Sequence, residues 1–202
     1  MSAPPLKPAT TALLLVDYQV GLCRADDRCV APPLAAQVEA RATLTVAAGV
    51  LAAARQAHLL IVHARLGFDR AYALRTNRTP RFDRYPGERL LLEDGPTAEI
   101  VPELEPVDEA IVTKGCIDPF IGTPLLPALV ANRIDTLIIG GVATNLAVES
   151  AARHAADCGL QPIVVEDMCA SFSPEIHELA VQQTIPLFAH VATSADIRMA
   201  LA

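Results

Sequence analysis

Short apolar runs alternate with longer alanine- and leucine-rich segments along most of this chain. The runs are nearly continuous in Val, Ile and Leu, which is typical of strands buried on both faces of a parallel sheet. They fall at residues 11–17, 58–64, 109–114, 135–141, 161–167 and 189–193. The pattern therefore predicts six strands.

Helices are predicted between these strands, where glycine and proline are sparse. Ser173 followed by Pro174 supports one helix start, because serine caps helices and proline is tolerated at the first helical position. Strands that alternate with helices specify a three-layer α/β/α fold around a six-stranded, mainly parallel sheet. The expected helices are 35–57, 123–132, 145–158, 174–187 and a terminal helix after 193.

Residues 65–95 break this alternation. The segment carries seven arginines, two prolines and several aromatic residues, and it has no clean period. Irregular segments of this length are uncommon in compact domains unless they serve a function, so we expect an excursion that covers a site or an interface. No repeat or linker divides the rest, and residues 1–202 are expected to form one domain.

The composition predicts a soluble globular protein. Hydrophobic residues make up 52% of the chain and charged residues 19%, which excludes disorder, and charges interrupt the apolar stretches before they could span a bilayer. The formal net charge of -7 provides no basic surface for nucleic acid or an anionic membrane. We expect a small-molecule partner or another copy of the chain, and no nucleic-acid or membrane partner.

The cysteines and histidines indicate no disulfide framework and no metal site. Five cysteines form an odd set without a C-x-x-C pair. The five histidines are scattered, and His63 has no partner at ligand spacing. The N-terminal segment MSAPPLKPAT lacks the apolar core of a secretory signal. Reduced thiols, a cytoplasmic location and a reaction without metal or cofactor are expected.

Two charged residues end predicted strands, where parallel sheets bind their ligands. Asp17 ends the first strand and Lys114 the third. If both face one crevice, each shifts the pKa of the other and the two groups could relay a proton. From position alone, a turn or capping role for Asp17 and a solvated Lys114 stay open as alternatives.

The segment GGVATNLAVESAARHA (140–155) predicts a strand, a glycine-rich turn and a helix. Such a turn presents backbone N–H groups and the positive end of the helix dipole to a ligand, so an oxyanion would sit there. Glycines are also common in these turns for steric reasons, which leaves a purely structural role open.

Four segments together resemble the isochorismatase-like hydrolases, also called cysteine hydrolases. They are LLLVDYQ, VTKGCIDPFIGTPL, IIGGVATNLAVESAARHA and VVEDMCASFSPEIH, and they match that family in order and spacing. The resemblance covers about residues 10–193. It implies an enzyme with an isochorismatase-like α/β fold, and because relatives usually assemble as dimers or tetramers it implies a homo-oligomer.

The resemblance also implies site residues. In amidase members the position of Ala147 holds a nucleophilic cysteine in the first turn of a helix, where its pKa is lowered. Asp17 would be the general base and acid, and Lys114 would hold the thiolate and orient Asp17. A cis peptide bond would join Val142 to Ala143, and the backbone amides of Ala143 and Ala147 would form the oxyanion hole.

Because a methyl group cannot attack a carbonyl, Ala147 leaves three interpretations open. The main hypothesis is a hydrolase of the C–N bond of a small amide or carbamoyl (ureido) compound, whose nucleophile has been replaced by alanine, as in an engineered inactive variant. The second is a naturally cysteine-free isochorismatase-type hydrolase, in which Asp17 protonates a vinyl ether for attack by water. The third is a ligand-binding or scaffold protein without catalysis.

The arginine-rich excursion suggests an anionic substrate, since guanidinium groups bind carboxylates in a bidentate manner. Arg65, just past its strand, is the first candidate for this contact, and Phe68 and Tyr72 could form an apolar wall. Surface ion pairs or subunit contacts are the alternative for most of the arginines. Three residues of the motifs above complete the substrate-binding candidates: Gln19, Phe120 and Asn145.

Overall fold

A computed structural model describes residues 6–202 and contains one six-stranded sheet with the strand order β3-β2-β1-β4-β5-β6. Every neighbouring pair is parallel, so the predicted α/β fold is confirmed with a wholly parallel sheet. The strands are β1 (Thr11–Val16), β2 (Leu60–Leu66), β3 (Ala110–Lys114), β4 (Thr136–Val142), β5 (Gln161–Ala170) and β6 (His190–Ala192).

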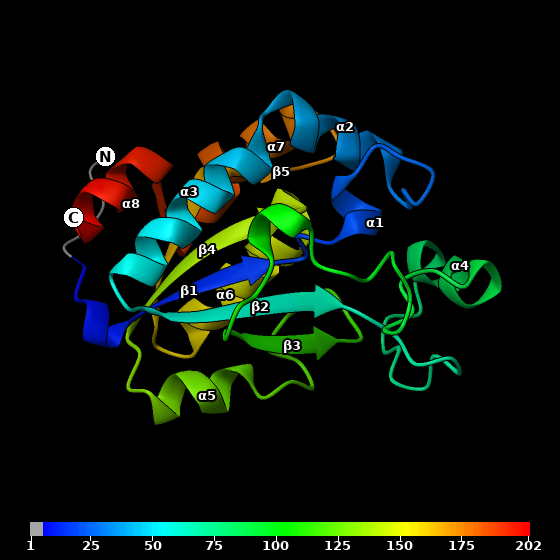
Figure 1. Ribbon diagram of the computed structural model, residues 1–202, viewed down its shortest axis with the longest axis horizontal. Coiled ribbons are helices and arrows are strands. Elements are labelled where there is room, and N and C mark those ends of the chain that lie inside the picture. Colours follow the sequence, from blue (N-terminus) through cyan, green and yellow to red (C-terminus); the bar gives the residue numbers. More distant parts are fainter. Residues whose placement is uncertain (1–5) are drawn as a thin grey trace.

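Helices cover both faces of the sheet (Figure 1). One layer holds α1 (Val20–Cys23), α2 (Pro32–Ala40), α3 (Thr43–Gln56) and α8 (Ser194–Leu201). The opposite layer holds α5 (Leu125–Ala131) and α6 (Glu149–Asp157). The remaining helices are α4 (Pro80–Glu88) and α7 (Pro174–Leu179), with shorter turns η1 (Pro8–Thr10), η2 (Pro102–Leu104), η3 (Thr144–Val148), η4 (Ala180–Thr184) and η5 (Ile185–Leu187).

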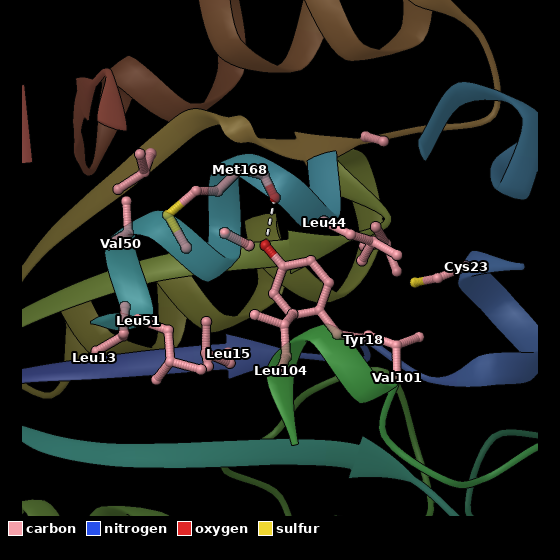
Figure 2. Close-up of a cluster of buried hydrophobic side chains, with 14 of the residues drawn as sticks. Leu13, Leu15, Tyr18, Cys23, Leu44, Val50, Leu51, Val101, Leu104 and Met168 are labelled. Carbon is pink, nitrogen blue, oxygen red and sulfur yellow. Dashed lines mark hydrogen bonds between the residues drawn. The ribbon is translucent and has the colours of Figure 1, made fainter. Parts of the chain in front are cut away.

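The central strand β1 is buried on both faces, which explains its continuous apolar run. Successive side chains of a strand point to opposite faces. Leu13 and Leu15 therefore pack in the core beneath α3, while Leu14 lies in the core on the other side. Figure 2 shows the first of these cores, where the Tyr18 hydroxyl donates a hydrogen bond to the Met168 carbonyl.

The predicted helix 35–57 is wrong in one respect, because the chain breaks between α2 and α3. Ala42 has a left-handed backbone, with φ of 52°. The preceding residue, Arg41, caps the C-terminal end of α2 and donates from Nε to the Cys169 carbonyl at 3.0 Å. The alanine-rich composition of this segment predicts a continuous helix, and the local sequence does not reveal a hydrogen bond to the distant Cys169. The predicted helix 174–187 has these bounds, and it consists of α7 followed by the wider turn η4 and the tighter turn η5.

The excursion at 65–95 is not wholly irregular, so that prediction is also corrected. Helix α4 lies within it, beyond the tips of β2 and β3 (Figure 1). Phe68, Tyr72, Phe82 and Tyr85 form a small aromatic core that supports α4. Because α4 is only nine residues long and mostly polar, it carries too few apolar positions to give a helical period.

The five cysteines are free thiols. Within residues 6–202 no helix is long and apolar enough to cross a membrane. The predicted absence of a secretory signal concerns a segment that begins with residues 1–5, which lie outside the described part of the chain.

The close approach of β4 to β1 yields a prediction at Gly141. A Cβ atom there would lie 2.3 Å from the Val16 carbonyl oxygen and 2.7 Å from the Val16 Cβ. We expect Gly141→Ala to lower the free energy of unfolding by about 2 kcal/mol or more, measured by urea denaturation. Gly87→Ala is the control, since a Cβ at Gly87 meets nothing within 4 Å. Equal stability of the two variants would show that β4 has more room than described.

Candidate active site

The carboxyl ends of three strands bring the candidate catalytic groups together. Asp17 follows β1, Lys114 ends β3, and Val142 ends β4. The strand β2 lies between β1 and β3, so the long lysine side chain reaches past it. Lys114 Nζ donates to Asp17 Oδ2 at 2.7 Å. Asp17 and Lys114 therefore form an ion pair at the edge where parallel sheets bind ligands.

Lys114 is held in one position by all of its hydrogen-bond donors. Besides Asp17, its Nζ donates to the carbonyl oxygens of Cys116 at 3.2 Å and Ile117 at 3.0 Å. The Lys114 side chain is 0% exposed. Since an ammonium group has three N–H donors, each one has an acceptor, and the buried positive charge is compensated.

Asp17 has one carboxylate oxygen bound to Lys114 and one without a partner. Burial raises the pKa of the Asp17 carboxyl, and the charge and hydrogen bond of Lys114 oppose this effect. Within residues 6–202, the buried oxygen Oδ1 of Asp17 has no hydrogen-bond partner. A carboxyl with a raised pKa and a free oxygen is suited to accept and return a proton.

A small cavity of about 40 Å³ adjoins this ion pair. Its volume corresponds to one or a few water-sized groups. The cavity brings together Asp17, Lys114, Val142, Ala143 and Ala147, which are the candidate catalytic, oxyanion-hole and cis-peptide residues. Apolar side chains and one arginine complete the wall: Leu22, Leu34, Leu66, Arg81, Phe82, Tyr85, Ile117, Leu146 and Phe172.

The turn after β4 places residue 147 at the cavity. The peptide bond between Val142 and Ala143 is cis, at the position implied by the family resemblance. The Ala143 carbonyl accepts hydrogen bonds from the backbone N–H groups of Leu146 at 3.0 Å and Val148 at 3.4 Å. These bonds form the first turn of the helical segment η3–α6, and Ala147 lines the cavity from this turn.

Gln19 lies near the site, but its side chain is used to join strand ends. Its Nε2 donates to the carbonyl oxygens of Leu66 at 2.8 Å and Ala98 at 3.1 Å, and its Oε1 accepts from the Leu66 N–H at 2.8 Å. Gln19 does not line the cavity. Its side chain therefore has a structural role, and its contact with substrate stays a prediction.

The candidates of the excursion do not line the cavity either. Arg65 donates from Nε to Thr113 Oγ1 at 3.0 Å, and Thr113 lies directly beside it on the neighbouring strand β3. The rings of Phe68 and Tyr72 lie 5.2 Å apart in the aromatic core, and the Tyr72 hydroxyl donates to the Leu90 carbonyl. This aromatic pair supports the cavity wall from behind, because its core includes the wall residues of α4.

Phe120 and Asn145 complete the set of predicted substrate contacts. Phe120 stacks on His154 with 4.5 Å between ring centroids, outside the cavity lining. Asn145 accepts a hydrogen bond from the Ser171 hydroxyl at 2.5 Å and lines a separate surface groove of about 520 Å³. Of the two, only Asn145 faces a space that a ligand could enter.

Sequence reasoning missed the wall residues of α4. Arg81, Phe82 and Tyr85 stand at helical spacing and face the cavity together. Thr79 followed by Pro80 is a helix-start signal that could have located this helix. The Arg81 guanidinium lies 4.4 Å from the centre of the Phe172 ring, in a cation–π contact.

Metal ligands are not grouped in the described part of the chain. No set of three His, Cys, Asp or Glu side chains among residues 6–202 could hold an ion. His63 is buried on β2, and desolvation lowers its pKa to about 4. His63 therefore belongs to the interior of the sheet.

The isochorismatase domain is the family whose model matches this chain, over residues 11–196. The chain belongs to the isochorismatase family. An uncharacterized isochorismatase family protein of Bacillus subtilis, YwoC, is 41% identical over 90 residues, which cover 44% of this chain and 48% of that protein. The matched part thus spans about half the length of this relative.

Two further relatives match over most of this isochorismatase-family chain. Maleamate amidohydrolase of Pseudomonas putida is 26% identical over 186 residues, covering 92% of this chain and 84% of that protein. The crystal structure of a cysteine hydrolase from Pseudomonas syringae superposes with a TM-score of 0.84 at 24% identity, covering 99% of this chain and 96% of the other. The latter similarity shows the shared fold.

Removal of Lys114 is predicted to destabilise the protein through Asp17. In Lys114→Met the buried Asp17 carboxyl loses its compensating charge, and we expect the free energy of unfolding to fall by about 3–5 kcal/mol in urea denaturation at neutral pH. Adding Asp17→Asn to this variant should recover part of the loss, because no uncompensated charge is then buried. Equal stability of the single and double variants would contradict the coupling of the two side chains.

Proposed function

We propose that this protein binds the amide or carbamoyl group of a small compound in the cavity and belongs to the C–N hydrolases of its family, with Asp17 as general acid and base. One observation carries the proposal. Asp17, which has a carboxylate oxygen without a hydrogen-bond partner among residues 6–202, lines the same cavity as residue 147. A nucleophile at position 147 could therefore attack the carbonyl carbon of a substrate, and Asp17 could transfer a proton to the leaving nitrogen of the same substrate.

The thiolate reaction accounts for each part of the site except Ala147. A thiol at this position would lose its proton to Asp17, and its sulfur would attack the amide carbon. Asp17 would return the proton to the leaving nitrogen, which departs as ammonia or an amine, and water would then hydrolyse the thioester. The backbone N–H groups of Ala143 and Ala147 would stabilise the oxyanion. Ala147 has no atom that can attack, so the unaltered chain would bind an amide without cleaving it.

Arg81 supports an anionic substrate and takes the role first predicted for Arg65. Arg70, Arg75 and Arg84 of the excursion form ion pairs with neighbouring acids. The ion pairs found among residues 6–202 do not include Arg81. Arg81 is thus a cavity-lining cation without a carboxylate partner in this part of the chain, and a substrate carboxylate would provide one. The similar maleamate amidohydrolase is named for a substrate that carries an amide and a carboxylate.

A second candidate function follows from Ala147 itself. If alanine is the natural residue, water must be the nucleophile and the enzyme must act by acid catalysis. Burial raises the pKa of Asp17, which favours the protonated form that a general acid requires. Asp17 would then protonate a vinyl ether, and water would complete the hydrolysis.

The Ala147→Cys substitution tests the main proposal. We expect the unaltered chain to release no ammonia from a panel of maleamate, succinamate and N-carbamoyl amino acids, and Ala147→Cys to release it. Adding Asp17→Asn should reduce this rate by about 100-fold or more, because proton transfer is lost. Ala156→Cys adds a thiol to the same helix outside the cavity lining and should stay inactive.

Each contrary outcome has a separate meaning. Ammonia release by the unaltered chain, or equally by Ala156→Cys, would contradict a nucleophile at position 147. Hydrolysis of a vinyl ether by the unaltered chain, with loss in Asp17→Asn, would establish the second candidate.

Recognition of the carboxylate can be measured without turnover. Titration calorimetry of the unaltered chain should give tighter binding of succinamate than of the uncharged propionamide. We expect Arg81→Gln to weaken succinamate binding by about 10-fold, which corresponds to about 1.4 kcal/mol, and to leave propionamide unaffected. Arg65→Gln is the matched control and should change neither affinity. The reverse ranking of the two arginine variants would restore Arg65 as the substrate contact.

A further inference from the structure

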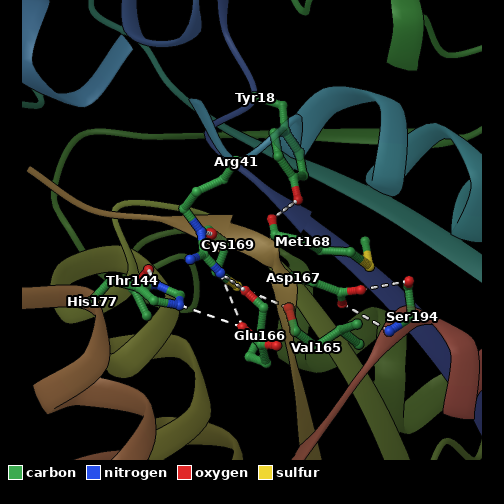
Figure 3. A network of polar contacts seen from close by, with 10 residues as sticks. All are labelled: Tyr18, Arg41, Thr144, Val165, Glu166, Asp167, Met168, Cys169, His177 and Ser194. Atoms are coloured by element: carbon green, nitrogen blue, oxygen red, sulfur yellow. Dashed lines mark hydrogen bonds and ion pairs between the residues drawn. The ribbon is translucent and has the colours of Figure 1, made fainter. Parts of the chain in front are cut away.

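A set of four polar side chains, of which Thr144 and His177 are buried and Arg41 and Glu166 are partly exposed, lies behind the turn that carries Ala143 and Ala147. His177 Nδ1 of α7 is 2.8 Å from Thr144 Oγ1, and His177 Nε2 is 3.5 Å from Glu166 Oε2. The same carboxylate oxygen accepts a hydrogen bond from Arg41 Nη2 at 3.0 Å. Figure 3 shows these four side chains, which we call the Thr144 network, converging from separate elements of the fold.

Charges in the Thr144 network set the direction of its hydrogen bonds. The His177 ring, followed by the Arg41 guanidinium, lowers the pKa of the Glu166 carboxyl, which is therefore ionised. His177 Nε2 makes no hydrogen bond among residues 6–202, and the Glu166 carboxylate oxygen 3.5 Å away favours the tautomer with the proton on that nitrogen. The Nδ1 lone pair then accepts a hydrogen bond from the Thr144 hydroxyl. Thr144 is 0% exposed, so its hydroxyl has no competing water.

The Thr144 network is anchored to a bulge of the sheet. The register between β4 and β5 shifts between Ile139 and Gly141, and Glu166 lies in the extra length of β5 at that point. Arg41 also donates to the carbonyl oxygens of Glu166 at 3.3 Å and Cys169 at 3.0 Å. Because Arg41 donates several hydrogen bonds to the bulge, the Glu166 carboxylate is held in position beside His177.

The other end of the Thr144 network is the catalytic turn. Thr144 directly follows Ala143 and is the first residue of the turn that leads to Ala147. Neither Thr144 nor His177 lines the cavity, so the network does not act as a hydroxyl nucleophile with its base. The remaining role for the Thr144 network is to hold the turn that carries the reacting groups.

We propose that His177 is a positioning residue that acts through Thr144. By fixing the first residue of the turn, it aligns the backbone N–H groups of Ala143 and Ala147 with the cavity. The catalytic use of this alignment rests on the proposed function, whereas the alignment itself is a property of the folded chain. Displacements of about 1 Å in such groups are sufficient to lower a rate by about 100-fold.

Backbone amide shifts test the alignment in the unaltered chain. We expect Thr144→Val, which has a similar shape and no hydroxyl, to move the ¹H–¹⁵N signals of Ala143 and Ala147, and Thr144→Ser to restore them. His177→Leu should act like Thr144→Val. His154→Gln is the control, since His154 pairs with Asp118 at 3.0 Å outside the cavity lining. Unchanged signals in both Thr144→Val and His177→Leu would overturn the proposal.

Kinetics in the Ala147→Cys chain provide the second readout. Thr144→Val should lower kcat by about 10-fold or more with little change in KM, because the oxyanion donors act in the transition state. Thr144→Ser should recover kcat, and a loss in KM alone would contradict positioning. If Ala147→Cys itself releases no ammonia, the proposed function fails, and the amide shifts alone decide the role of His177.

Discussion

The buried ion pair between Asp17 and Lys114 is the constraint on which this site depends. Two opposite charges are removed from water at the end of a parallel sheet, and they are tolerated because each donor of Lys114 has an acceptor. Asp17 follows β1 and Lys114 ends β3, and these two strands flank β2. The distance that the lysine side chain spans is therefore set by the strand order of the sheet. The ion pair leaves the other carboxylate oxygen of Asp17 without a hydrogen-bond partner among residues 6–202, and this oxygen is the basis of the proposed acid–base role.

The rest of the site consists of the turn after β4 and the helix α4, which both line the cavity. The turn after β4 is held by backbone hydrogen bonds and, from behind, by the Thr144 network. On the other side, α4 contributes an apolar wall and the unpaired Arg81, and the small aromatic core supports it. Under the proposed function, this division would place proton transfer on the sheet and selection of the substrate on the excursion. In isochorismatase-family proteins, the first part would stay similar while the second varies with the substrate.

Much of the fold was predictable because its signals are local. The apolar run of β1 reflects burial on both faces, and the candidate positions at the strand ends follow from the parallel sheet. The break at Ala42 was not predictable, since it depends on an arginine contact with a distant strand. Substrate contacts were the least predictable. Arg65 and Arg81 belong to the same arginine-rich segment, and only the folding of α4 determines which of them reaches the cavity.

The central claim is that a nucleophile at position 147 attacks the amide carbon of the substrate while Asp17 protonates the nitrogen of the same amide. Its most direct test is peptide mass analysis of the Ala147→Cys chain, quenched in acid within milliseconds of mixing with maleamate. The account predicts an added mass equal to the substrate minus ammonia, on the peptide that contains position 147. An acyl group on Cys116 or on any other native cysteine, in place of position 147, would contradict it.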